Sequence, residues 1–148
     1  MNPFVEFSKN HIFWISLAAW FCAQTIKVVT GVIRERRFNF KWFVSTGGMP
    51  SAHTAGVSAL STLVGLSYGF DSALFAISTA FTLIIMFDAQ TVRFTMGRQA
   101  RILNQMLDDM YWKKKLDEEK VKEFLGHTPL QVFAGAALGI VVALLMYK

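Results

Sequence analysis

Thr46-Gly47-Gly48-Met49-Pro50-Ser51-Ala52-His53-Thr54 is a turn that leads directly into an apolar run. Its glycines let the backbone bend so that N–H groups point inward. Ser51 is a good N-cap, and Pro50 fixes how the chain enters the next helix. The first turn of that helix offers unpaired N–H groups and the positive end of a dipole, which favour an anion such as phosphate. His53 is placed to pass a proton to a ligand there; the alternative is a capped helix whose histidine has no function.

The composition of the whole chain is that of a membrane protein. The chain has 148 residues, of which 53% are hydrophobic, and its formal net charge is +5. This length favours one domain. Long apolar runs separate the basic segments, so an anionic membrane surface is a better partner for the charge than nucleic acid. Cys22 is the one cysteine of the sequence, so an intrachain disulfide cannot form.

Four apolar runs are long enough to cross a bilayer as helices, at residues 12–29, 51–68, 72–94 and 128–147. The expected fold class is therefore an all-α integral membrane protein with about four transmembrane helices, formed by a single domain over residues 1–148. Two connectors, 30–50 and 95–127, join the spans. The second connector is highly charged and is expected to be helical.

Four spans place both connectors on one membrane face, and both termini with the turn at 69–71 on the other. Of fifteen Lys and Arg residues, four fall in the first connector and seven in the second. The positive-inside tendency therefore puts the connectors in the cytoplasm and both termini outside, in the plasma (inner) membrane. A phosphate site would also gather basic residues on its own face, so the two explanations overlap.

Ionisable residues within or beside the spans gather at the face of the connectors. Such residues are costly in a bilayer and are usually functional. Random placement would scatter them over both faces. The alternative is that the lysine and the arginine only extend their long side chains to the interface. The set comprises Lys27, His53, Asp88, Arg93 and His127.

Two further patterns concern helix faces. A polar stripe forms if the third span runs on as a helix beyond the membrane, and a solvated face is the alternative explanation. A Gly-x-x-x-Gly pair in the fourth span indicates close helix packing. The stripe comprises Arg93, Gly97, Arg101, Asn104 and Asp108, and the pair is Gly135 with Gly139.

At these positions the sequence resembles the type-2 phosphatidic acid phosphatase and vanadium haloperoxidase superfamily, in its small divergent membrane branch. That superfamily carries Lys-x6-Arg-Pro, then Pro-Ser-Gly-His, then Ser-Arg-x5-His-x3-Asp. The divergent branch is marked by Gly-Gly-Met-Pro-Ser, Asp-Ala-x-x-Val-Arg and Gly-His-Thr-Pro. These three motifs stand here at residues 47–51, 88–93 and 126–129.

The chain also departs from the superfamily pattern. Glu35 replaces the proline that should follow the first arginine, and the third motif is split by the charged connector. Gln131 stands where the superfamily has an aspartate. A glutamine accepts the same hydrogen bond from an imidazole but supplies no charge to stabilise its protonated form.

The resemblance implies a membrane phosphohydrolase that removes phosphate from a lipid phosphate or diphosphate, of prenyl or phosphatidate type, through a phosphohistidine. His127 would attack phosphorus, His53 would protonate the leaving oxygen, and Gln131 would hold the nucleophilic ring. No metal and no cofactor are expected. Asp88 would orient or neutralise a basic neighbour. Phosphate would be bound by Lys27, Arg34, Arg93, Gly47, Gly48 and Ser51.

Two other functions stay open. A non-catalytic binder or carrier of phosphorylated lipid would use the same pocket without a covalent step, and Gln131 favours it. A small structural or assembly protein would use the polar residues only to pack helices. The expected partners are a phosphorylated membrane lipid, the bilayer and a second copy in a homodimer, because four helices give limited cover to a lipid pocket.

Overall fold

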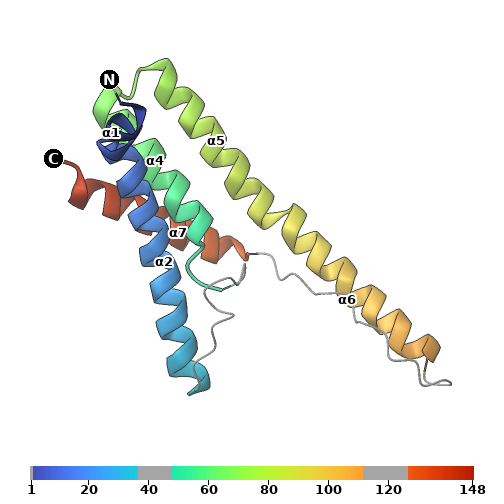
Figure 1. Ribbon diagram of the computed structural model, residues 1–148. Helices are drawn as coiled ribbons and strands as arrows, with labels where there is room; N and C mark the ends of the chain where they lie inside the picture. The colour runs from blue at the N-terminus through green and yellow to red at the C-terminus, as the bar shows by residue number, and fades with distance from the viewer. Residues whose placement is uncertain (1, 37–47, 112–126) are drawn as a thin grey trace.

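The computed structural model describes residues 2–36, 48–111 and 127–148. Every regular element in these ranges is a helix, which confirms the all-α class (Figure 1). The helices are α1 (Pro3–Ser8), α2 (His11–Glu35), α4 (Ala52–Tyr68), α5 (Ala73–Gln90), α6 (Val92–Tyr111) and α7 (Pro129–Met146).

Helix α4 lies at the centre of the bundle, where it contacts α2, α5 and α7. The buried core is made mostly of small side chains, which allow membrane helices to approach closely. Because α4 is enclosed in this way, its buried positions hold mostly alanine, serine and threonine, and Leu63 is the one large apolar residue among them. The fully buried alanines of the core are Ala19, Ala23, Ala55, Ala59 and Ala143.

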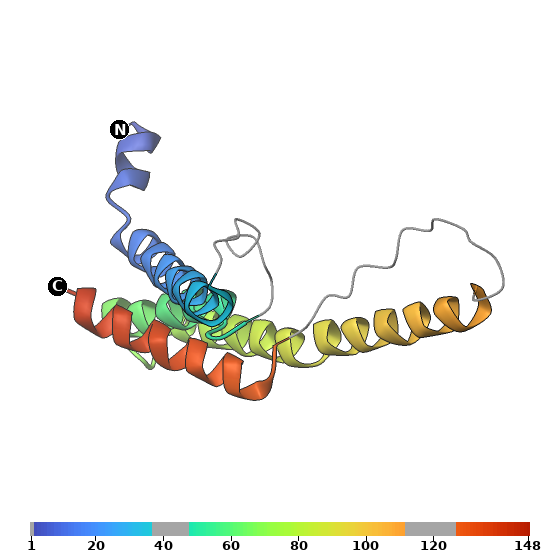
Figure 2. The same ribbon diagram turned by 90° about the horizontal axis from the view of Figure 1, so that it is seen from below.

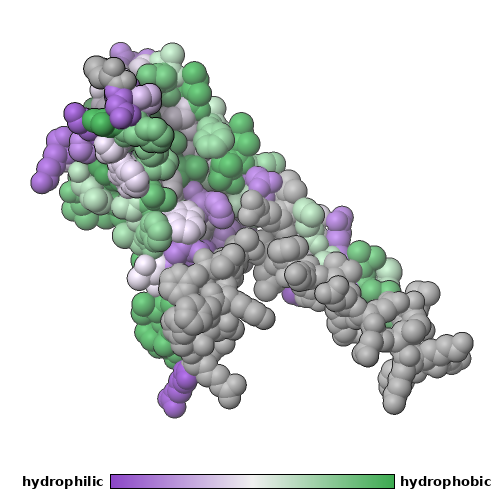
Figure 3. Space-filling model, in the orientation of Figure 1, coloured by the Kyte–Doolittle hydropathy of each residue, from purple (hydrophilic) through white to green (hydrophobic). Residues whose placement is uncertain are grey.

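The outside of the bundle is strongly apolar, as expected for a surface in contact with lipid (Figure 3). Three described stretches are long and apolar enough to cross a membrane: His11–Ile33, Ala73–Leu107 and Pro129–Met146. Large side chains on α5 and α7 are more than half exposed, among them Ile77, Ile84, Phe87, Leu130 and Phe133. In water such a surface would be unfavourable, but in a bilayer it needs no cover.

The helix starts expected from the sequence are present at α4 and α7. Ser51 caps α4, and Thr128 caps α7 with Pro129 in the first turn. Helix α1 was not expected, although Asn2 followed by Pro3 is a typical helix start. Local cap chemistry therefore accounts for these boundaries.

The expected third span, 72–94, is divided at Thr91. The Thr91 N–H still donates to the Phe87 carbonyl oxygen at 2.9 Å, but the φ of −101° and ψ of −67° at Thr91 depart from regular helix values. Helix α5 ends one residue earlier, and α6 then continues past the rest of the bundle (Figures 1 and 2). Arg93 therefore lies in the first turn of α6. Part of the expected helical connector is α6, and residues 112–126 lie outside the described residues.

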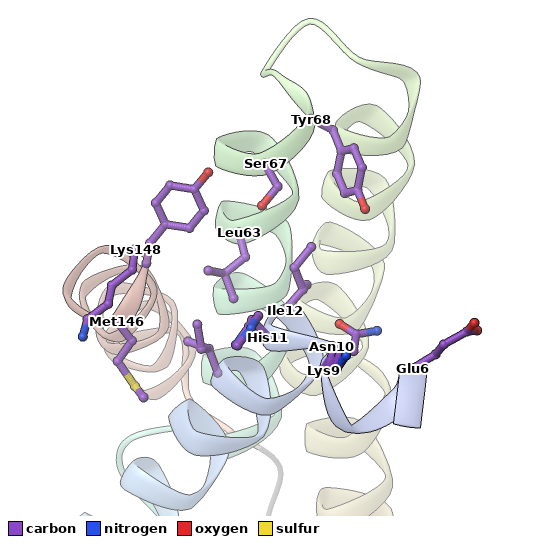
Figure 4. A pocket seen from close by; sticks show the side chains of 12 residues that line it. Glu6, Lys9, Asn10, His11, Ile12, Leu63, Ser67, Tyr68, Met146 and Lys148 are labelled. Carbon is purple, nitrogen blue, oxygen red and sulfur yellow. The ribbon is translucent and has the colours of Figure 1, made fainter. Parts of the chain in front are cut away.

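The two ends of the bundle differ. Both termini and the turn after α4 lie at one end, where the Tyr147 hydroxyl donates to the Leu66 carbonyl oxygen at 2.9 Å (Figure 1). A cavity of about 680 Å³ opens there, lined by residues such as Lys9, Leu63 and Tyr68 (Figure 4). The starts of α4 and α7 and the end of α5 lie at the other end. The helix ends are thus grouped as expected, and the membrane faces on which they lie stay a prediction.

Candidate functional site

The start of α7 holds His127, Thr128 and Gln131 in one hydrogen-bonded unit. Gln131 Oε1 accepts the Thr128 N–H at 3.1 Å and lies 3.2 Å from His127 Nδ1. Thr128 Oγ1 in turn accepts the Gln131 N–H at 3.4 Å. This reciprocal pair is a capping box, which satisfies donors that the first turn would otherwise leave unpaired. The His127 side chain is only 2% exposed, so Gln131 orients a buried imidazole.

The turn that precedes α4 is bonded to the same unit. The Ser51 N–H donates to the Gln131 carbonyl oxygen at 3.0 Å. Ser51 is fully buried, and the Thr54 hydroxyl donates to its Oγ at 2.9 Å. Gly135, one turn further along α7, leaves no room for a side chain, because a Cβ there would overlap the Ser51 carbonyl oxygen. Backbone contacts thus hold the turn before α4 close to the first turns of α7.

Lys27 brings a cationic side chain to this turn from α2. The residue is 8% exposed, and a Cβ built on Gly48 would lie 3.8 Å from Lys27 Cγ and Cδ. Within the described ranges, no carboxylate forms an ion pair with Lys27. A buried cation without a counter-charge is costly, and an anionic ligand would offset that cost.

Gly48 has the backbone geometry that the turn requires. Its φ is +97°, in a region of backbone conformation that residues other than glycine rarely adopt. The following residues, Met49 and Pro50, complete the approach to Ser51. The sequence therefore needs glycine at this position to place the turn between Lys27 and the start of α7.

The last turn of α5 closes the cluster on another side. The His127 N–H donates to the Ala89 carbonyl oxygen at 3.2 Å. Asp88, the preceding residue, is half-buried. The structure thus places Asp88 next to the backbone contact of the site, and its supporting role stays a prediction.

The structure describes the other expected site residues only in part. His53 lies in the first turn of α4 and is exposed. Arg34 lies in the last turn of α2 and Arg93 in the first turn of α6, and their side chains are outside the described part of the structure. Gly47 lies outside it altogether. The structure therefore brings together Lys27, Gly48, Ser51, His127 and Gln131.

Sequence reasoning missed two buried polar residues near this cluster. Gln24 lies one turn before Lys27 on α2, and Thr54 is bonded to Ser51 on α4. The spacing of three between Gln24 and Lys27 was the available signal, because it places both on one helix face. Within the described residues, no group of three or more His, Cys, Asp or Glu side chains could hold a metal ion.

Comparison with known proteins shows a family match over most of the chain. Residues 8–142 match the model of a family described as the divergent PAP2 family. The uncharacterized membrane protein YuiD of Bacillus subtilis (strain 168) is 41% identical over 153 aligned positions, which cover 96% of this chain and 97% of that protein. No solved structure matches the chain.

Proposed function

The chain belongs to the divergent PAP2 family, and from this premise we propose that it removes phosphate from a membrane lipid phosphate or diphosphate through a phosphohistidine. The observation that carries the proposal is the buried cation of Lys27 beside the Gly48–Ser51 turn, which is itself bonded to the unit that holds His127. A phosphoryl group bound there would supply the counter-charge that Lys27 lacks among the described residues, and it would lie near an oriented imidazole.

The contacts of Gln131 support a nucleophilic role for His127. Gln131 Oε1 accepts the backbone N–H of Thr128, which assigns the oxygen rather than the amide nitrogen to that position. The same oxygen faces His127 Nδ1, so in a neutral ring Nδ1 must carry the proton that is shared with it. Nε2 then carries the lone pair, which is the form that an attacking imidazole needs.

The proposed reaction has two steps. His127 Nε2 attacks phosphorus, the P–O bond to the lipid breaks, and His53 gives a proton to the leaving oxygen. His53 then takes a proton from water, the hydroxide attacks phosphorus, and the P–N bond breaks to release phosphate. Lys27, with Arg34 and Arg93, would balance the charge on the equatorial oxygens during both steps.

The substrate class follows from the position of the site. The cluster lies at the start of α7 and the end of α5, two helices with apolar outer surfaces, so a ligand with a phosphate head and an apolar chain would suit both environments. Leu130 on α7 and Phe87 on α5 are exposed close in sequence to His127 and Ala89. A prenyl phosphate and a phosphatidate both meet these requirements.

The decisive experiment is acid-labile phosphate trapping on the purified full chain with a panel of labelled lipid phosphates. We expect label on the wild type and none on His127→Asn, together with a loss of phosphate release of at least about a thousandfold. His11→Asn is the matched control, because His11 lies at the opposite end of the bundle. Phosphate release at the wild-type rate from His127→Asn would disprove the mechanism.

A specific observation favours a second function, that of a non-catalytic binder or carrier of phosphorylated lipid. Gln131 is neutral, and its Oε1 already serves the capping box, so it gives little support to a positively charged imidazole. A carrier would bind the same lipids and protect the protein against thermal unfolding, without phosphate release and without labelled histidine. The trapping experiment therefore separates the two functions.

A further inference from the structure

The end of the bundle that carries both termini holds a cavity of about 680 Å³ (Figure 4). Three parts of the chain form its walls: the junction of α1 and α2, the last turns of α4, and the end of α7. This volume lies in the range of small-molecule sites, which is about 300–1,000 Å³. The proposed reaction uses no residue of these walls, because the candidate site lies at the opposite end of the bundle (Figure 1).

Local contacts fix the wall formed by the junction of α1 and α2. The Asn10 side chain accepts the Phe13 N–H at 3.0 Å and so caps α2. The Trp14 indole N–H donates to the Ser8 carbonyl oxygen at 3.1 Å, and the centroids of the Phe7 and Phe13 rings lie 4.9 Å apart. These contacts hold α1 at an angle to α2, as Figure 2 shows.

The end of α7 is fixed to α4 in a similar way. Tyr147 lines the cavity, and its hydroxyl donates to the Leu66 carbonyl oxygen at 2.9 Å. Specific contacts therefore hold the cavity walls on two sides, so the cavity is a feature of the folded bundle.

The lining of the cavity includes two members of the buried core. Ile15 and Leu63 are 9% and 1% exposed and belong to the core cluster that α2, α4 and α7 share. Leu145, which precedes the lining residue Met146, is 78% exposed on the apolar outside of the bundle. An alkyl chain from the bilayer would meet apolar side chains both beside the cavity and inside it, so it would stay out of contact with water.

The charged lining of the cavity favours an anion. Lys9 and Lys148 line it together with one acidic residue, Glu6. Figure 4 shows the Glu6 carboxylate pointing away from the other labelled side chains. Within the described residues, neither lysine forms an ion pair with a carboxylate side chain. An acidic head group would accept charge-assisted hydrogen bonds from both lysines.

We propose that this cavity binds an anionic amphiphile, which is a molecule with an acidic head group and an alkyl chain. The head group lies between Lys9 and Lys148, and the first part of the chain lies on Ile15 and Leu63. Two kinds of ligand share this chemistry: a bilayer phospholipid with an acidic head group, and a free fatty acid. The site is separate from the candidate site at the other end of the bundle and does not depend on the proposed activity.

The first test is native mass spectrometry of the full chain in mild detergent, with phosphatidylglycerol or with phosphatidylcholine of the same acyl chains. The wild type should bind one phosphatidylglycerol at least about tenfold more tightly than phosphatidylcholine, because the net charge of its head group is negative. The double variant Lys9→Gln and Lys148→Gln should lose this preference. Arg98→Gln is the matched control, since it removes an exposed cation from α6 and should keep the preference.

The second test fills the cavity and leaves its charges unchanged. Ser67→Trp places an indole ring in the lining and should weaken phosphatidylglycerol binding at least about tenfold. Wild-type affinity in this variant, equal binding of both phospholipids by the wild type, or an unchanged preference in the double lysine variant would overturn the proposal.

Further ligands identify the source of the amphiphile and the end of the bundle that binds it. Stronger binding of phosphatidylglycerol than of palmitate identifies a bilayer lipid, and the reverse order identifies a free fatty acid. Inorganic phosphate has no chain and should not compete; full competition at equal concentration would overturn the proposal. The preference for phosphatidylglycerol should persist in Lys27→Met, since its loss there would assign the binding to the candidate site instead.

Discussion

Gln131 joins three parts of the site through one side chain and one carbonyl group. Its Oε1 faces His127 and completes the cap of α7, and its carbonyl oxygen accepts the Ser51 N–H. A carboxylate at the same position would keep the acceptor and add a negative charge beside the imidazole. It would also suit the first turn of a helix, where acidic residues are favourable.

We therefore predict that Gln131→Glu preserves the fold and raises lipid phosphate turnover about tenfold, because a charged hydrogen bond stabilises the protonated His127 better than a neutral one. Gln131→Leu, which removes the acceptor, should lower turnover at least about a hundredfold. Phosphate release measured on equal amounts of folded protein checks both variants. Equal rates for glutamine, glutamate and leucine would show that the residue serves only the helix cap.

A substitution of Lys27 tests whether its buried charge binds a ligand or only packs within the helix bundle. Lys27→Met keeps the length and most of the apolar packing of the side chain but removes the cation. We predict that the ligand-free variant unfolds at the same or a higher temperature, because the variant no longer buries a charge that has no carboxylate partner in the described part of the chain. Saturating vanadate should raise the melting temperature of the wild type by roughly 5–10 °C and leave the variant unchanged.

The control for this measurement is Lys9→Met at the opposite end of the bundle, where the lysine is exposed. Its response to vanadate should match that of the wild type. A full vanadate response in Lys27→Met would remove the lysine from the anion site.

Among the helices, the contact between α4 and α7 determines the geometry of the site. Gly135 lies against the backbone of Ser51, and Gly139 lies against that of Ala55. The two glycines are one turn apart, so they let the helices approach along a continuous surface. Because Ser51 and Gln131 lie at the end of that surface, the packing of the helices and the position of the turn are coupled.

A substitution at this contact should affect both stability and the site. Gly135→Ala would place a Cβ 3.2 Å from the carbonyl carbon and the Cβ of Ser51 and into its carbonyl oxygen, so we predict a loss of about 1–3 kcal/mol and weaker vanadate binding. Gly56→Ala on α4 is the matched control, because its Cβ would meet Ser16 and Trp20 at an ordinary 3.6 Å. It should be neutral or slightly stabilising. Thermal unfolding with and without vanadate measures both effects.

The sequence predicts those parts of the fold that local chemistry determines. Ser51 is a recognisable cap, the fourth apolar run begins at residue 128, and the glycine pair in α7 indicates close packing. It does not reveal that Gly135 packs against Ser51, since that contact joins residues far apart in the chain. The break at Thr91 was not predicted for another reason: the apolar run continues through it, and only the backbone angles of Thr91 mark the end of α5.

The predicted site residues came from the family resemblance and from the one-sided placement of ionisable residues, and neither signal distinguishes their roles. Gln24 and Thr54 were not predicted, because a polar residue in a span gives no sign of which neighbour it will meet. Gln131 was identified as a substitution for an aspartate. Its second function, as the cap of α7, became clear only from the hydrogen bonds to Thr128.

At the scale of the whole molecule, the two ends of the bundle are chemically distinct. The site end carries the buried lysine and histidine, and α6 extends beyond it, whereas the other end carries both termini and the turn that contains Asp71. From the excess of basic residues in the two connectors we propose that the site end faces the cytoplasm. Phosphate released from a lipid would then enter the cytoplasm, and the apolar chain would remain in the bilayer.

Labelling in sealed right-side-out vesicles tests this orientation. In a Cys22→Ser background, a membrane-impermeant maleimide should modify Asp71→Cys without permeabilisation, because both residue 71 and the termini are expected outside. Arg101→Cys on α6 should react only after detergent opens the vesicles, with at least about tenfold less label before that. Both positions are exposed in the structure, so burial cannot explain a difference between them. The reverse pattern would place the site on the outer face, and equal labelling of both would show that the chain inserts in both directions.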